Sequence, residues 1–87
     1  MVIETFKTPG AIDVYRRARD KGRMLPDGLE YVSSWIGFDF KRCWQLMKTE
    51  KKELLQEWID HWSDLVEFEI IAVQTSSEAM EAMKSRL

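Results

Sequence analysis

The stretch LLQEWIDHWSDLVEFEIIAV, residues 54–73, changes its hydrophobic period halfway along. At about 100° per residue, its apolar side chains up to Trp62 fall within an arc of roughly 140°, the width expected of a helix that lies on a core. These side chains are Leu54, Leu55, Trp58, Ile59 and Trp62. Residues 65–73 are instead rich in β-branched and aromatic residues with alternating glutamates, which is typical of a strand. The stretch therefore predicts a helix that turns directly into a strand.

The preceding half of the chain predicts one strand, one helix and a hairpin. Residues 1–7 have strand composition, and the TPG that follows suits a helix start with Thr8 as cap and Pro9 in the first turn. Apolar residues then recur at spacings of three and four until Gly22 stops the helix. After the turn sequence RMLPDG, residues 29–38 and 42–48 predict two strands of a hairpin.

Helix caps frame the other half of the chain. Thr49 is a plausible cap for the helix in residues 54–62. TSSE, residues 75–78, has the spacing of a capping box and predicts a closing helix. Ala79, Met80, Met83 and Leu87 share one side of that helix, which we interpret as helix core.

The resulting order is strand, helix, strand, strand, helix, strand, helix, which predicts one α+β domain over residues 1–87. A split βαβ repeat most economically gives the ferredoxin-like plan, a four-stranded antiparallel sheet in spatial order 4-1-3-2 with two helices on one face. The other face of such a sheet is left bare.

Strand alternation allows the two faces of the sheet to be assigned separately. The more apolar set is predicted to lie under the helices: Ile3, Trp44, Leu46, Val66, Phe68, Ile70 and Ala72. The more mixed set is predicted to line the bare face: Val2, Glu4, Phe6, Tyr31, Ser33, Trp35, Cys43, Gln45, Met47, Glu67, Glu69 and Ile71. An exposed face with this many aromatic side chains predicts a homodimer that packs sheet on sheet.

Polar groups on the bare face form the candidate site. Glu4, Gln45 and Glu69 are expected to converge among aromatic rings, with Tyr31 and Trp35 as further ligand-binding residues. Carboxylates in such a setting bind a cationic or hydroxylated small molecule, or act as acid and base. The alternatives are a polar dimer interface and a water-filled sheet face.

Composition limits the partners and the compartment. The net charge is −2, from 13 Lys plus Arg and 15 Asp plus Glu, so no strong field favours nucleic acid or an anionic membrane. No apolar run approaches the roughly 20 residues that cross a bilayer, and the start resembles no signal peptide. Cys43 is the single cysteine, which suits a reducing compartment. We therefore expect a cytoplasmic protein without nucleic-acid or membrane partners.

Three further features have a structural and a functional interpretation. His61 lies at the border of the helical stripe, four residues after Glu57, and is interpreted as a surface residue, with a general base as the alternative. Cys43 is interpreted as a packed small hydrophobe, with a nucleophile or redox sensor as the alternative. The cations of residues 15–23 are interpreted as a solvated face, with nucleic-acid binding as the alternative. No metal-ligand spacing is present, and no cofactor is expected.

The segments MVIETF, YRRARDKGRMLPDGLEYVSSW, RCWQLM and LLQEWIDHWSDLVEFEIIAV resemble a family of short, mostly bacterial proteins known only as a domain of unknown function. The resemblance covers nearly the whole chain. It implies membership of the dimeric α+β-barrel superfamily, which includes cofactor-independent monooxygenases, haem-degrading enzymes and sensor domains. The expected function is small-molecule binding or sensing on the open sheet face of a homodimer. A cofactor-independent enzyme and a structural or protein-interaction module are the alternatives.

Overall fold

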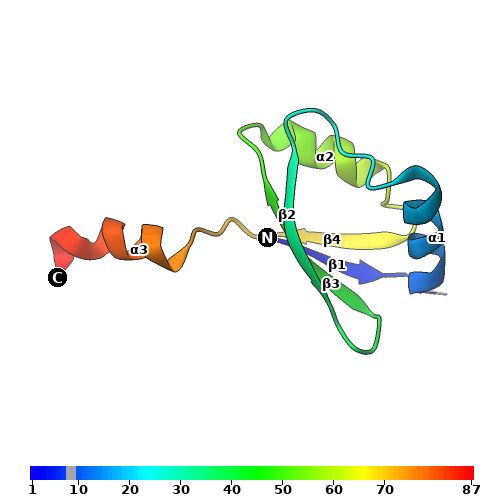
Figure 1. Ribbon diagram of the computed structural model, residues 1–87, viewed down its shortest axis with the longest axis horizontal. Helices are drawn as coiled ribbons and strands as arrows, with labels where there is room; N and C mark the ends of the chain where they lie inside the picture. Colours follow the sequence, from blue (N-terminus) through cyan, green and yellow to red (C-terminus); the bar gives the residue numbers. More distant parts are fainter. Residues whose placement is uncertain (8–9) are drawn as a thin grey trace.

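The computed structural model describes residues 1–7 and 10–87. The elements are, in chain order, β1 (Val2–Phe6), α1 (Ala11–Lys21), β2 (Glu30–Ile36), β3 (Arg42–Lys48), α2 (Lys52–Asp60), β4 (Val66–Ile70), α3 (Ser76–Met83) and a short 3-10 turn (Lys84–Arg86) (Figure 1). The alternation predicted from the sequence is confirmed, including the hairpin of β2 and β3.

The four strands form one antiparallel sheet in the order β2-β3-β1-β4. This is the predicted spatial order, and it confirms the α+β ferredoxin-like layout. One irregularity lies in β2, where the register shifts between Tyr31 and Ser33. Such a bulge changes which side chains of a strand point to each face.

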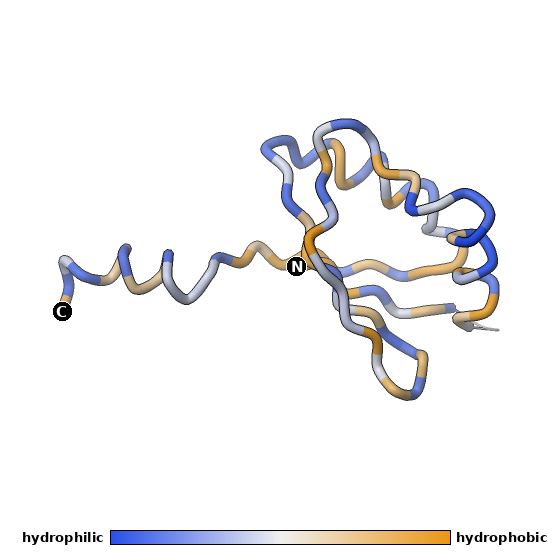
Figure 2. The backbone as a smooth tube through the Cα atoms, viewed as in Figure 1, coloured by the Kyte–Doolittle hydropathy of each residue, from blue (hydrophilic) through white to orange (hydrophobic). Residues whose placement is uncertain are grey.

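The helices α1 and α2 pack on one face of the sheet. The buried core consists of Val2, Leu29, Trp58, Ile59 and Trp62, with Val14 and Ala18 of α1 packed against it. Trp58 also meets the ring of Phe68 edge-on, with 5.4 Å between centroids. Figure 2 shows that hydrophobic residues recur along α2 and along the central strands. The helical stripe predicted for residues 54–62 is therefore the packing surface.

The predicted faces of β1 and β3 were wrong. Val2, Glu4, Cys43 and Gln45 are buried under the helices, whereas Ile3, Trp44 and Leu46 lie on the open face. The assignment for Val66 and Phe68 of β4 was correct, because Phe68 pairs with Glu4 and so shares its face. The error has a physical origin: hydrophobicity places Trp44 and Leu46 inside and Glu4 and Gln45 outside, and this sheet does the reverse.

Of the two predicted N-caps that lie in the described residues, one is confirmed. Thr75 and Glu78 form the predicted capping box at the start of α3. α2 begins instead after Lys51, and the Thr49 hydroxyl accepts a hydrogen bond from the Lys51 amide at 3.1 Å, so Thr49 is not the cap. The predicted cap Thr8 and its neighbour Pro9 lie outside the described residues.

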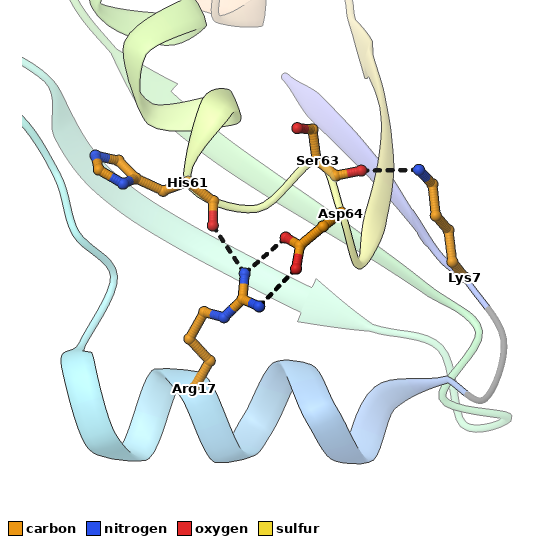
Figure 3. A network of polar contacts seen from close by, with 5 residues as sticks. All are labelled: Lys7, Arg17, His61, Ser63 and Asp64. Carbon is orange, nitrogen blue, oxygen red and sulfur yellow. Dashed lines mark hydrogen bonds and ion pairs between the residues drawn. The ribbon is translucent and has the colours of Figure 1, made fainter.

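Arg17 ties α1 to the loop between α2 and β4 (Figure 3). Its guanidinium donates to both carboxylate oxygens of Asp64 at 2.7 Å and to the His61 carbonyl at 2.9 Å. It also lies 5.6 Å from the ring centroid of Trp62. Hydrogen bonds from Arg17 lower the pKa of Asp64 to about 2. The predicted solvated face therefore contains a residue that positions α1 over the sheet.

The packing of α2 gives a direct test of the core. Ile59 is 9% exposed and belongs to the buried cluster. We expect Ile59→Ala to lower the free energy of unfolding by about 2–5 kcal/mol, because a cavity is left where the side chain was. Glu57→Ala, on the exposed side of the same helix, should change it by less than about 0.5 kcal/mol. Urea denaturation measures both, and equal losses would contradict this packing.

Candidate functional site

Polar side chains lie beneath the helices on the two central strands. Glu4 is 7% exposed and Gln45 is 3% exposed. Glu4 is directly opposite Cys43 across the β1–β3 pair, and Val2 is opposite Gln45, so the polar groups occupy adjacent positions on one face. A buried carboxyl and a buried amide at the centre of a small sheet are costly for folding unless they have partners.

Arg23, which follows α1, is the main partner of these groups. Its guanidinium donates to the Gln45 side-chain oxygen at 3.2 Å and lies 3.6 Å from the ring centroid of Tyr31. The Gln45 amide nitrogen in turn donates to the Met47 sulfur at 3.1 Å. The Tyr31 hydroxyl and the Ser34 hydroxyl are 2.7 Å apart. Gln45, Tyr31 and Arg23 are thus held in fixed orientations on the helix side of the sheet.

Two tryptophans fix the backbone of Arg23. The indole nitrogens of Trp58 and Trp62 both donate to the Arg23 carbonyl oxygen, at 3.0 and 3.1 Å. The residues on either side, Gly22 and Met24, have φ values of 68° and 58°. A left-handed φ at a residue other than glycine is strained and persists only where the surroundings hold it. The two indoles supply that restraint at Met24.

A cavity of about 460 Å³ lies between this face of the sheet, α1 and the two tryptophans. Its floor includes Glu4, Phe6, Cys43 and Gln45, and its walls include Val14, Tyr15 and Ala18 of α1 and the rings of Trp58 and Trp62. Arg23 also lines it. This volume is within the range of small-molecule sites, and apolar walls with a few convergent polar groups are their usual composition.

Burial shifts the pKa values of the titratable side chains that line the cavity. It raises the pKa of the Glu4 carboxyl above its ordinary value, although hydrogen bonding from the Cys43 thiol and the charge of Arg23 offset part of the shift. Burial, followed by the charge of Glu4, raises the pKa of Cys43 to about 12. Burial likewise raises the pKa of Tyr15, with Cys43 and Glu4 adding to the effect. Cys43 is therefore a neutral thiol near neutral pH, not a thiolate nucleophile.

The structure divides the residues that the sequence grouped as one site. Glu4, Tyr31 and Gln45 lie together on the helix-covered face. Glu69 is paired with Ile3, and Trp35 with Trp44, so both belong to the open face on the other side of the sheet. The predicted convergence of Glu69 with Glu4 was therefore wrong. Glu4 pairs with Phe68, and Glu69, the next residue of β4, points to the opposite face of the sheet.

Sequence reasoning missed the groups that complete the cavity, namely Arg23, Tyr15, Trp58 and Trp62. The helical period of the sequence places both tryptophans on the apolar stripe, but it does not indicate a hydrogen-bond partner for their indole N–H groups. A signal was available, since buried tryptophans need a hydrogen-bond acceptor and the turn after Gly22 leaves backbone carbonyls free. Arg23 had been counted with the solvated cations.

His61 takes no side-chain part in the site. It is exposed, and Figure 3 shows its imidazole directed away from Arg17 while its backbone carbonyl accepts the hydrogen bond. Within residues 1–7 and 10–87, no group of three or more His, Cys, Asp or Glu side chains is arranged to hold a metal ion. Over the same residues, no helix is both long and apolar enough to cross a membrane.

The family model described as a domain of unknown function (DUF3303) matches residues 1–87, and the chain belongs to this family. No curated protein and no solved structure gives a significant match.

The raised pKa of Glu4 predicts a pH-dependent stability. Since the pKa is higher in the folded chain, the carboxyl's favourable contribution is complete below its ordinary value of 4.5 and is lost as pH rises through the folded pKa. Glu4→Gln cannot ionise. We therefore expect the free energy of unfolding of Glu4→Gln, relative to wild type, to rise between pH 4 and pH 8.

Urea denaturation across this pH range measures the difference. The matched control is Glu57→Gln, on the exposed side of α2, for which the change with pH should be smaller than for Glu4→Gln because Glu57 is not buried. A pH-independent difference for Glu4→Gln would show that the carboxyl is not desolvated.

Proposed function

We propose that this DUF3303 protein binds a compact organic molecule in the cavity between α1, the two tryptophans and the sheet. The observation that carries the proposal is that a buried carboxyl and a buried amide line a cavity large enough for a ligand. A chain of 87 residues has little stability to spare, and buried polar groups reduce it further. Polar groups retained at this cost are characteristic of functional sites.

The chemistry of the lining defines the class of ligand. The aromatic rings of Phe6, Trp58 and Trp62 suit the apolar part of a ligand. Glu4 and Arg23 supply the charged side chains of the lining. The Glu4 carboxyl accepts a hydrogen bond and, when protonated, also donates one, while Arg23 only donates. The ligand that fits is a mainly apolar or aromatic molecule with a hydroxyl or carbonyl oxygen at one end. The binding site lies under α1 and not on the open sheet face expected from the sequence.

An enzymatic role is the second candidate, and Glu4 favours it. A carboxyl with a raised pKa beside the Tyr15 phenol has the properties of a general acid or base in a partly dry site. The reaction would be a proton transfer at the ligand's polar end, without participation of the protonated Cys43. We assign the role to the cytoplasm, because a single buried cysteine suits a reducing compartment.

A thermal-shift screen of small hydroxylated and carbonyl-bearing compounds tests the binding site. Each compound is measured on wild type, Glu4→Leu and Glu69→Leu, and every shift is referred to the same variant without compound. A true ligand at 100 times its Kd should stabilise wild type by about 2.7 kcal/mol. For a domain of this size, we expect a rise in Tm on the order of 10 °C.

The two variants locate the site. The shift should remain in Glu69→Leu and fall to less than half in Glu4→Leu, because Glu4 lines the cavity and leucine neither donates nor accepts a hydrogen bond. Equal shifts in all three proteins, or a loss confined to Glu69→Leu, would contradict binding in this cavity.

A further inference from the structure

Residues 71–87, here the C-terminal arm, extend away from the domain. Figure 1 shows α3 standing apart from the sheet and from α1 and α2. All residues of the arm except Ala79 are exposed, including Val73 at 55%, Met80 at 57% and Leu87 at 84%. The sequence had predicted this apolar side as helix core. A helix of only eight residues is marginal in water without packing, even with a capping box.

The open face of the sheet is the second uncovered apolar surface. It carries Ile3, Trp44 and Leu46 on the two central strands, and Trp35, 55% exposed, on the edge strand β2. Arg42 is 5.5 Å from the ring centroid of Trp44. Both helices that cover the sheet lie on the other side, as the lining of the cavity shows. One chain thus contains an apolar helix and an apolar sheet face, each without cover.

The exposed area is large enough for a stable interface. A compact chain of 10.3 kDa should expose roughly 5,400 Å². This chain exposes 6695 Å², an excess of about 1,300 Å². Each partner in a standard stable complex buries about 800 Å². The radius of gyration, 15.1 Å, likewise exceeds the roughly 12 Å of a compact chain of this length.

The arm presents its apolar side chains on one side. At about 100° per residue, Met80 and Met83 lie about 60° apart around α3, with Glu78 and Glu81 on the opposite side. Glu81 is paired with Lys84 within the arm, at 2.8 Å. The methionine side of the arm is therefore the half that suits the apolar sheet face, while its glutamates stay toward solvent.

We propose that the C-terminal arm of each copy packs across the open sheet face of a second copy, whose own arm packs in return. The arm starts from a fixed point, since Met1 and Ile71 exchange hydrogen bonds of 2.7 and 2.8 Å, and it leaves that point directed away from its own sheet. A two-fold pair covers both arms and both faces with one repeated contact. The partner is a second copy of this chain because the chain supplies both halves of the contact.

Sedimentation equilibrium of the full chain between 1 and 100 µM tests whether two copies pair through their arms. We expect wild type to have twice the mass of 10.3 kDa. Met80→Glu combined with Met83→Glu should raise the dimer dissociation constant at least 100-fold. The arm is remote from the core, so the domain should still fold and unfold cooperatively in urea. Ile12→Glu, a charge placed at a 67% exposed residue of α1, is the matched control and should leave the dimer intact.

A change on the sheet identifies the other half of the contact. Trp35→Glu, at a 55% exposed position of the open face, should weaken the dimer as the arm changes do, because the two surfaces would meet across the interface. A wild type that is monomeric at 100 µM, with its arm folded on its own sheet or free for another partner, overturns the proposal. A dimer that is insensitive to the Met80 and Met83 changes overturns it as well, since it would be formed through another surface.

Discussion

The carbonyl oxygen of Arg23 is the point on which the site depends. It accepts the indole hydrogens of both Trp58 and Trp62, so one backbone atom joins the end of α1 to α2. This restraint stabilises the left-handed turn at Gly22 and Met24 and directs the Arg23 guanidinium over Tyr31 and toward Gln45. It also sets the tryptophan rings as walls beside a space that they do not fill. The cavity is thus a consequence of how the helices are attached to each other.

The helix-covered face of this sheet is only partly a hydrophobic core. Val2, Val66 and the two tryptophans provide the apolar packing, while Glu4, Cys43 and Gln45 occupy the centre of the same face. Burial of these polar groups reduces stability, and it also produces the raised pKa of Glu4. The loss of stability and the raised pKa of Glu4 therefore have one origin, the desolvation of a carboxyl beneath α1.

Local signals in the sequence predicted the elements, their order and the capping box of Thr75 and Glu78. The helical stripe ending in Trp62 was also predicted, because periodicity is a local property. The faces of β1 and β3 could not be predicted in the same way. Neighbouring residues of a strand point to opposite faces, so a shift of one residue places Ile3 where Glu4 lies and Trp44 where Gln45 lies. The rule that apolar side chains are buried fails where polar residues line a cavity under the helices and where a sheet face is left open. Glu4, Gln45 and Tyr31 share one face, as the sequence grouped them, but it is the helix-covered face, and Glu69 and Trp35 lie on the other.

The central claim is that Glu4 is desolvated in a ligand-sized cavity and not solvated on an open sheet. The most direct measurement is a ¹³C NMR titration of the Glu4 side-chain carboxyl in the intact protein. Glu4 should titrate above its ordinary pKa of 4.5, and its chemical shift should respond when a ligand found by screening is added. A Glu4 carboxyl that titrates at or below 4.5 and is insensitive to every ligand that stabilises the protein would contradict it.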